Sequence, residues 1–258
     1  MTPPQEVTLD LTPNPQAAPV AARWWAQSRL EWRLLMTNGE QILLTLIIPV
    51  AVLFAVTRLG LAEVDEATPG VMALAILSTA FTATAISTGF ERRSGVLKFL
   101  GATPLGRSGL LVGKTAATFA VIAVQMVLVT AVAMWLGWSQ TVAQPLLVVG
   151  TVILGTVALG SWGFALAGLL RAEATLAVAN GIFLLLLFAG GTVLPTDRLP
   201  DVMAGFVAFL PSAALGDALR TLMDAPSGAD GTPWGPIAIL AGWAVSGIVV
   251  SVRTFRWE

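Results

Sequence analysis

The sequence predicts an all-α membrane protein with six transmembrane helices, on two observations. Of its 258 residues, 56% are hydrophobic and only 11% are charged, whereas a soluble domain has about 25% charged residues. So few charges cannot cover the surface of a water-soluble fold of this size, but a lipid environment requires no polar surface. In addition, six separate stretches are apolar over about 20 residues each, the length that a helix needs to cross the hydrocarbon core.

The first 20 residues are predicted to form a disordered cytoplasmic tail. They contain five prolines, two acidic residues and no basic residue, and they lack the apolar run of a secretory signal. Such a composition cannot bury enough apolar surface to offset the entropy of folding. Residues 21–258 are predicted to form a single membrane domain.

An amphipathic helix is expected over residues 21–38, before the first span. At 100° per residue, Trp24, Trp25 and Trp32 share one face, and basic residues occupy much of the rest of the circle. This pattern is typical of a helix that lies in the headgroup plane of the membrane. An ordinary juxtamembrane helix with no special task is the alternative.

The six spans are predicted at about residues 42–61, 70–90, 110–136, 146–170, 174–194 and 234–252. Their only charged residues are Arg58 and Lys114, each near the end of its span. A further apolar stretch, residues 202–215, is too short to span and contains Pro211, so we expect a re-entrant or interfacial segment there, between the fifth and sixth spans. Glycines at short intervals in the fourth span are expected to serve packing within the chain, with a dimer face as the alternative.

Basic residues in the loops predict the orientation of the chain. With six spans both termini lie on one side of the membrane, and that side collects ten basic residues against three on the other. The positive-inside rule then makes the termini cytoplasmic. The ten are Arg23, Arg29, Arg33, Arg92, Arg93, Lys98, Arg107, Arg171, Arg253 and Arg256.

The longest cytoplasmic loop, residues 91–107, joins the second and third spans. Glu91 to Leu100 is expected to form one short helix that ends at Gly101, and Thr103-Pro104 is expected to open the next helix. A short helix held between two spans is a suitable handle for a soluble partner. A basic loop that serves only to set the topology is the alternative.

A distinctive set of residues runs from this loop into the third span. It comprises Glu91-Arg92, Gly95, Leu97, Leu100, Thr103-Pro104-Leu105, Leu110-Leu111 and Gly113-Lys114. The set resembles the pattern of type-2 ABC exporter permeases, a family that includes drug, antibiotic and polysaccharide exporters. Val96 and Lys98 depart from that pattern. A weaker resemblance to the family's segment between spans five and six is carried by Gly190-Gly191, Pro195, Leu199-Pro200, Leu210-Pro211 and Asp217-Ala218-Leu219-Arg220.

The resemblance implies a permease subunit of an ATP-driven exporter in a bacterial plasma membrane. The loop would be the coupling helix that docks on a separate ABC ATPase subunit, and a second permease copy would complete a homodimer or heterodimer. Residues 91–107 would provide the coupling contacts through Glu91, Arg92, Gly95, Leu97, Leu100, Thr103 and Pro104. No cofactor is expected in this chain, because ATP would bind to the partner. The apolar bundle favours a lipophilic or amphiphilic cargo of the drug or antibiotic kind.

Two other functions are weighed against export. An ion-coupled secondary transporter of a small amphiphile is the main alternative, although no acidic residue lies in any predicted span. An enzyme is not expected, because the chain has no histidine or cysteine and its spans lack a catalytic cluster. Gly109 to Thr115 looks like a nucleotide-binding P-loop, but three residues separate its glycines where that motif has four.

Overall fold

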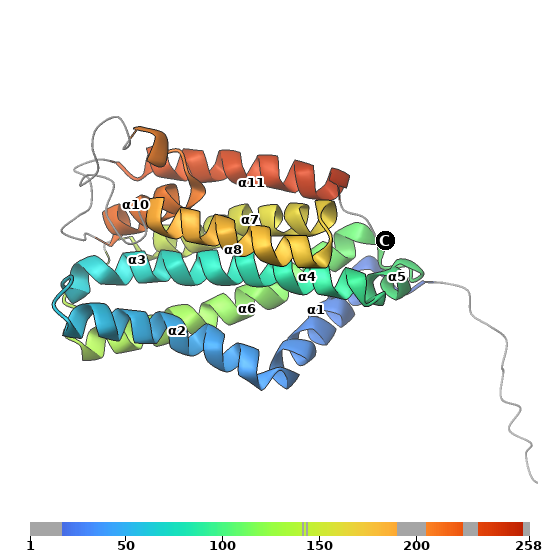
Figure 1. Ribbon diagram of the computed structural model, residues 1–258, viewed down its shortest axis with the longest axis horizontal. Helices are drawn as coiled ribbons and strands as arrows, with labels where there is room; N and C mark the ends of the chain where they lie inside the picture. Colours follow the sequence, from blue (N-terminus) through green and yellow to red (C-terminus); the bar gives the residue numbers. More distant parts are fainter. Residues whose placement is uncertain (1–16, 141, 143, 190–204, 224–231, 255–258) are drawn as a thin grey trace, which may run out of the picture.

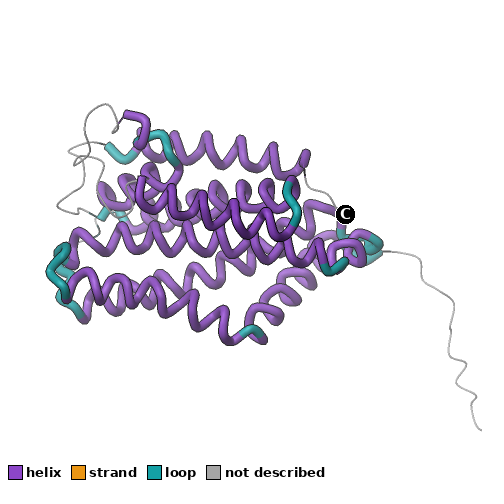
Figure 2. Tube along the Cα trace, viewed as in Figure 1, coloured by secondary structure: helices purple, strands orange, loops and turns teal. Residues whose placement is uncertain are grey.

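The computed structural model describes residues 17–140, 142, 144–189, 205–223 and 232–254, and these residues form a bundle of helices (Figures 1 and 2). No strand occurs among them. The all-α prediction is therefore confirmed for this part of the chain. The predicted tail up to residue 16 and residues 190–204 of the predicted hairpin lie outside the described residues.

From α1 to α6 the helices follow one another through short connections. α3, η1 and α4 join end to end into one continuous helix, of which η1 is a π-helical section. In chain order the elements are α1 (Val20–Thr37), α2 (Gly39–Arg58), α3 (Val64–Ile76), η1 (Leu77–Ala83), α4 (Thr84–Arg93), α5 (Val96–Gly101), α6 (Gly106–Trp135), α7 (Pro145–Leu169), α8 (Ala172–Ala189), α10 (Pro211–Leu222) and α11 (Trp234–Thr254).

Four of the described helices are long and apolar enough to cross a membrane. They are Val64–Arg93, Gly106–Trp135, Pro145–Leu169 and Trp234–Thr254. Two shorter apolar helices, Thr45–Arg58 and Ala172–Phe188, coincide with the predicted first and fifth spans. The structure therefore shows several helices whose length and composition suit a membrane span, while the count of six remains a prediction.

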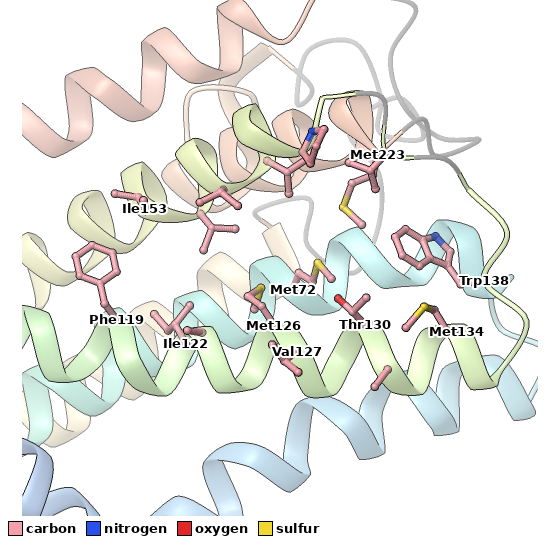
Figure 3. A pocket seen from close by; sticks show the side chains of 17 residues that line it. Met72, Phe119, Ile122, Met126, Val127, Thr130, Met134, Trp138, Ile153 and Met223 are labelled. Carbon is pink, nitrogen blue, oxygen red and sulfur yellow. The ribbon is translucent and has the colours of Figure 1, made fainter.

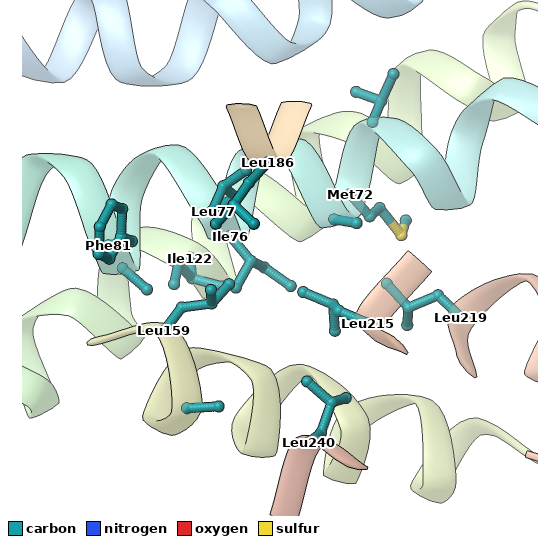
Figure 4. Close-up of a cluster of buried hydrophobic side chains, with 14 of the residues drawn as sticks. Met72, Ile76, Leu77, Phe81, Ile122, Leu159, Leu186, Leu215, Leu219 and Leu240 are labelled. Carbon is teal, nitrogen blue, oxygen red and sulfur yellow. The ribbon is translucent and has the colours of Figure 1, made fainter. Parts of the chain in front are cut away.

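The continuous helix α3–η1–α4 occupies the middle of the bundle. Its residues Ile76, Leu77 and Phe81 are buried and pack with Leu159 of α7 and Leu215 of α10 (Figure 4). Helices α2, α6, α7, α8 and α10 all contact this central helix. A helix surrounded in this way has little lipid-facing surface, and its sequence from residue 67 to residue 90 is uncharged and largely apolar on all sides.

Glycines of α7 allow it to approach both the central helix and α10 closely. A Cβ atom added at Gly163 would lie 2.7 Å from the carbonyl oxygen of Phe81 in η1, and one at Gly155 would lie 2.7 Å from Leu215. Both substitutions would force neighbouring atoms apart. At these two positions the glycines serve packing within the chain, as expected from the sequence, whereas Gly150 faces open space.

Pro211 lies where the apolar stretch changes from one helical segment to the next. Residues 205–207 are helical, residues 208–210 form a turn and a bend, and Pro211 then occupies the first turn of α10. A proline there loses nothing, since its missing N–H would have had no partner in the helix. Helix α10 packs against α3, α7 and α11, and it lies at the end of the bundle opposite α5 (Figure 1).

Candidate functional site

One end of the bundle, here named the α5 end, brings together α1, α5, the start of α6 and the end of α11 (Figure 1). The prediction of a single helix from Glu91 to Leu100 is wrong. α4 continues to Arg93, and α5 begins only at Val96. Gly95 separates the two helices because its φ of 79° is left-handed, a conformation that ends helices and favours glycine. Gly101 ends α5, as expected.

Thr103 and Pro104 do not open the next helix as expected, because α6 begins at Gly106. The Thr103 hydroxyl donates a hydrogen bond to the Leu100 carbonyl at 2.6 Å, so it closes the end of α5 instead. The Pro104 carbonyl accepts a hydrogen bond from the Arg23 guanidinium of α1. Thr103 and Pro104 therefore close the end of α5 and join it to α1.

Helix α5 has one buried side and one exposed side. Leu97 is fully buried against Leu110 of α6, and Leu100 is partly buried. Phe99, by contrast, is 80% exposed, and Val96 is also exposed. Leu97 is thus an anchor of the loop and not a surface contact. Phe99, which was not among the predicted contact residues, is the large apolar side chain that this helix presents outward.

Three charged side chains meet beneath α5. The Lys114 ammonium of α6 lies 3.1 Å from a carboxylate oxygen of Glu31 in α1 and 2.6 Å from one of Glu91 at the end of α4. Lys114 is 5% exposed and Glu31 is 7% exposed. Gln27 donates a hydrogen bond of 2.7 Å to Glu31. We name Glu31, Glu91 and Lys114 the buried charge cluster, and it ties α1, α4 and α6 together.

The resemblance of residues 109–115 to a P-loop reflects a helix contact. Gly109 and Gly113 lie one turn apart on α6, facing α1. A Cβ atom at Gly113 would lie 2.5 Å from Cγ of Gln27, and one at Gly109 would lie 3.0 Å from the Trp24 ring. Glycines four residues apart let two helices approach to backbone distance. They seat α1 on α6 and so place Glu31 beside Lys114.

The predicted division of α1 into a tryptophan face and a polar face is only partly observed. Trp25 is 71% exposed, but Trp24 and Trp32 are partly covered. On the polar side, Gln27 and Glu31 are buried. Burial of these polar groups is favourable because they are paired with each other and with Lys114. The sequence offered one signal for this contact, a lysine placed inside a span.

Two neighbouring arginines connect the end of α4 to helices α7 and α8. The Arg92 guanidinium donates to the carbonyl oxygens of Gly168, at 2.9 Å, and Leu170, which lie at the end of α7. These carbonyls have no partner within their own helix. Arg93 forms an exposed ion pair with Glu173 of α8. Residues 91–93 therefore contact four other helices, α1, α6, α7 and α8, directly or through Lys114.

A second polar contact lies deeper in the bundle. The amide of Gln125 in α6 donates to the backbone carbonyl of Thr45 in α2 at 2.9 Å and to the Thr79 hydroxyl of η1 at 3.0 Å. Gln125 is 1% exposed. This contact was not predicted, although a glutamine inside an apolar span was a visible signal. Its partner η1 is a π-helix, a feature that is frequent at functional sites.

An apolar groove of about 820 Å³ lies between α6 and α7. Figure 3 shows Phe119 and Met126 of α6 facing Ile153 of α7, with Trp138 and Met223 at one end. Thr130 contributes a hydroxyl to a wall that is otherwise mostly aliphatic and aromatic. The groove suits a lipophilic molecule.

The fold and this site together define a multi-pass helical membrane protein with an interhelical ionic contact beneath a short loop helix. The model of the ABC-2 type transporter family matches residues 21–223. The chain therefore belongs to this family, and it is a permease subunit of an ABC transporter, a transport subunit that is not itself catalytic. The match begins at α1 and ends after α10. No curated protein matches the chain.

Proposed function

We propose that this permease works in an ATP-driven exporter of lipophilic or amphiphilic compounds in a bacterial plasma membrane. Two permease copies would form the membrane part, and two ATPase subunits would dock at the α5 end. The observation that carries this proposal is Phe99, which is 80% exposed on a helix that Leu97 anchors to the bundle. An exposed aromatic side chain on a rigid support is a common centre of protein interfaces.

The distribution of charge supports a cytoplasmic position for the α5 end. Basic residues at this end lie at the end of α4, in α5, at the start of α6, in the turn after α7 and at the end of α11. At the other end, the turn before α3 and its first residues carry carboxylates. A bundle that follows the positive-inside rule keeps its basic end in the cytoplasm, where ATP is available. The basic set is Arg92, Arg93, Lys98, Arg107, Arg171 and Arg253, and the acidic set is Glu63, Asp65 and Glu66.

The contacts of residues 91–93 support a route by which movement of α5 reaches the spans. A displacement of α5 moves Glu91, which pulls on Lys114 and thereby on α6 and α1. The same displacement moves Arg92 and Arg93, which hold the ends of α7 and α8. Because these contacts are short and the cluster is largely buried, α5 and five further helices, α1, α4, α6, α7 and α8, respond as a connected unit.

The experiment tests Phe99 as the docking residue. The tagged full-length chain is purified from its native membranes, and the ATPase that co-purifies is quantified for wild type and Phe99→Asp. We expect loss of most of the ATPase, because a carboxylate replaces the apolar contact. Leu59→Asp is the matched control, since Leu59 is 72% exposed in the turn before α3. Equal ATPase recovery with both variants, or export driven by an ion gradient in vesicles without ATP, would contradict the proposal.

A further inference from the structure

A second cavity, of about 660 Å³, lies beneath the α5 end between α1, α2, α6 and the central helix. Its volume is within the range of small-molecule sites. One part of its wall is apolar and includes Leu34 of α1 and Val121 of α6; another part is the buried charge cluster. Leu34 is half exposed, so the cavity opens beside α1. A wall with one charged and one apolar part matches an amphiphile.

The net charge of this wall determines whether it favours a positively or a negatively charged occupant. The charged residues that line the cavity in the described part of the chain are Glu31, Glu91 and Lys114, which at neutral pH sum formally to one negative charge. The Glu91 side chain is 25% exposed, whereas those of Lys114 and Glu31 are 6% and 9% exposed. Glu91 is therefore the charged group that a molecule in the cavity reaches most easily.

Hydroxyl groups on the cavity wall also favour a positively charged occupant. Thr84 donates its proton to the Thr79 carbonyl, Ser87 to the Thr84 carbonyl, and Thr118 to the Lys114 carbonyl. A hydroxyl has one proton to donate, so these three oxygens present only lone pairs to the cavity. This part of the wall therefore offers hydrogen-bond acceptors, an arrangement that favours a donor or a cation over an anion.

We propose that this cavity binds an amphiphile with a single positive charge. The cationic head lies at Glu91, and the apolar body lies along Leu34 and Val121. The cavity is built by a single copy of the chain, so binding needs no second permease. That the occupant is exported cargo rests on the proposed function, whereas its binding does not.

The test uses a pair of ions with similar shape and opposite charge. The full-length chain is reconstituted in phosphatidylcholine nanodiscs without nucleotide, and binding of radiolabelled tetraphenylphosphonium and of tetraphenylborate is measured, with empty nanodiscs subtracted. We expect saturable binding of the cation and none of the anion. Glu91→Gln removes the charge at constant shape and should weaken cation binding about tenfold. Glu63→Gln, at an exposed carboxylate at the other end, should leave it unchanged.

A second variant keeps the test informative if Glu91→Gln disturbs the fold. Leu34→Trp places a larger ring at the opening without touching the charge cluster, and it should abolish saturable binding. Leu43→Trp is its control, because Leu43 is exposed on α2 and does not line the cavity. Equal binding of both ions, or cation binding that survives Leu34→Trp, would overturn the proposal. Since no ATPase or nucleotide is present, failure here leaves the docking of Phe99 untouched, and failure of docking leaves this binding untouched.

Discussion

Two regions of this permease join helices through buried polar side chains, and they do so with different chemistry. At the α5 end, Lys114 holds two carboxylates. In the middle of the bundle, the neutral amide of Gln125 holds a carbonyl and a hydroxyl. A charge far from water carries a large desolvation cost, while a neutral amide carries a smaller one. The comparison teaches that the ionic contact of Lys114 lies at an end of the spans, where it can also connect to a soluble partner, whereas Gln125 joins the middle of the bundle without a charge.

The largest effect on the free energy of unfolding is expected at the α5 end, where the contact is ionic. Lys114→Met leaves Glu31 and Glu91 facing each other without a cation, and removal of one partner from a buried ionic contact costs about 3–5 kcal/mol. We expect a loss of this size in the free energy of unfolding, measured by tryptophan fluorescence during titration of micelles with a denaturing detergent. Arg107→Met is the control, because Arg107 is exposed near the start of the same helix. Equal losses for the two variants would show that the cluster contributes no special stability.

An intermediate effect is expected where α1 sits on α6. Gly113→Leu drives a side chain into Gln27, whose Cγ lies 2.5 Å from the position of a Cβ. Overpacking of this kind costs about 1–3 kcal/mol and moves Glu31 away from Lys114. We expect lower stability together with faster proteolysis of α1. Gly150→Leu is the matched change at a glycine with open space, and it should preserve both properties; if it is as harmful as Gly113→Leu, close approach is not the cause.

The smallest effect is expected in the middle of the bundle. Gln125→Leu removes the amide contacts to Thr45 and Thr79, and interhelical hydrogen bonds in membranes contribute about 0.6–1.7 kcal/mol. The same denaturing titration should therefore show a smaller loss than for Lys114→Met. Asn180→Leu is the control, since the Asn180 amide bonds only one turn back along its own helix, to the Leu176 carbonyl. A loss for Gln125→Leu as large as that for Lys114→Met would remove the distinction between the two regions.

Much of the fold could be predicted from the sequence, because the length and hydrophobicity of a segment are local properties. The α1 helix, the long apolar helices and the end of α5 at Gly101 follow from such patterns. The predictions failed where a single residue adopts a conformation that depends on its neighbours. Gly95 breaks the expected coupling helix in two, and Thr103 closes α5 instead of opening the next helix.

The candidate site was predicted at the right loop but with incomplete roles. Glu91 and Arg92 belong to it, yet they face the bundle and hold other helices. Leu97 is buried, and Phe99 takes the outward position. A helix of one to two turns that contains several apolar residues does not reveal which of them faces inward, because its rotation depends on the helix beneath it.

By itself the sequence determined that this protein lies in lipid and not in water. A chain with 11% charged residues and long apolar stretches belongs in lipid, since each span must bury its polar backbone in a helix and expose apolar side chains. The tertiary structure alone decided which polar groups meet. Lys114 and Glu31 are 83 positions apart, and only the seating of α1 on Gly109 and Gly113 brings them together, because a buried charge is stable where a distant segment supplies its partner.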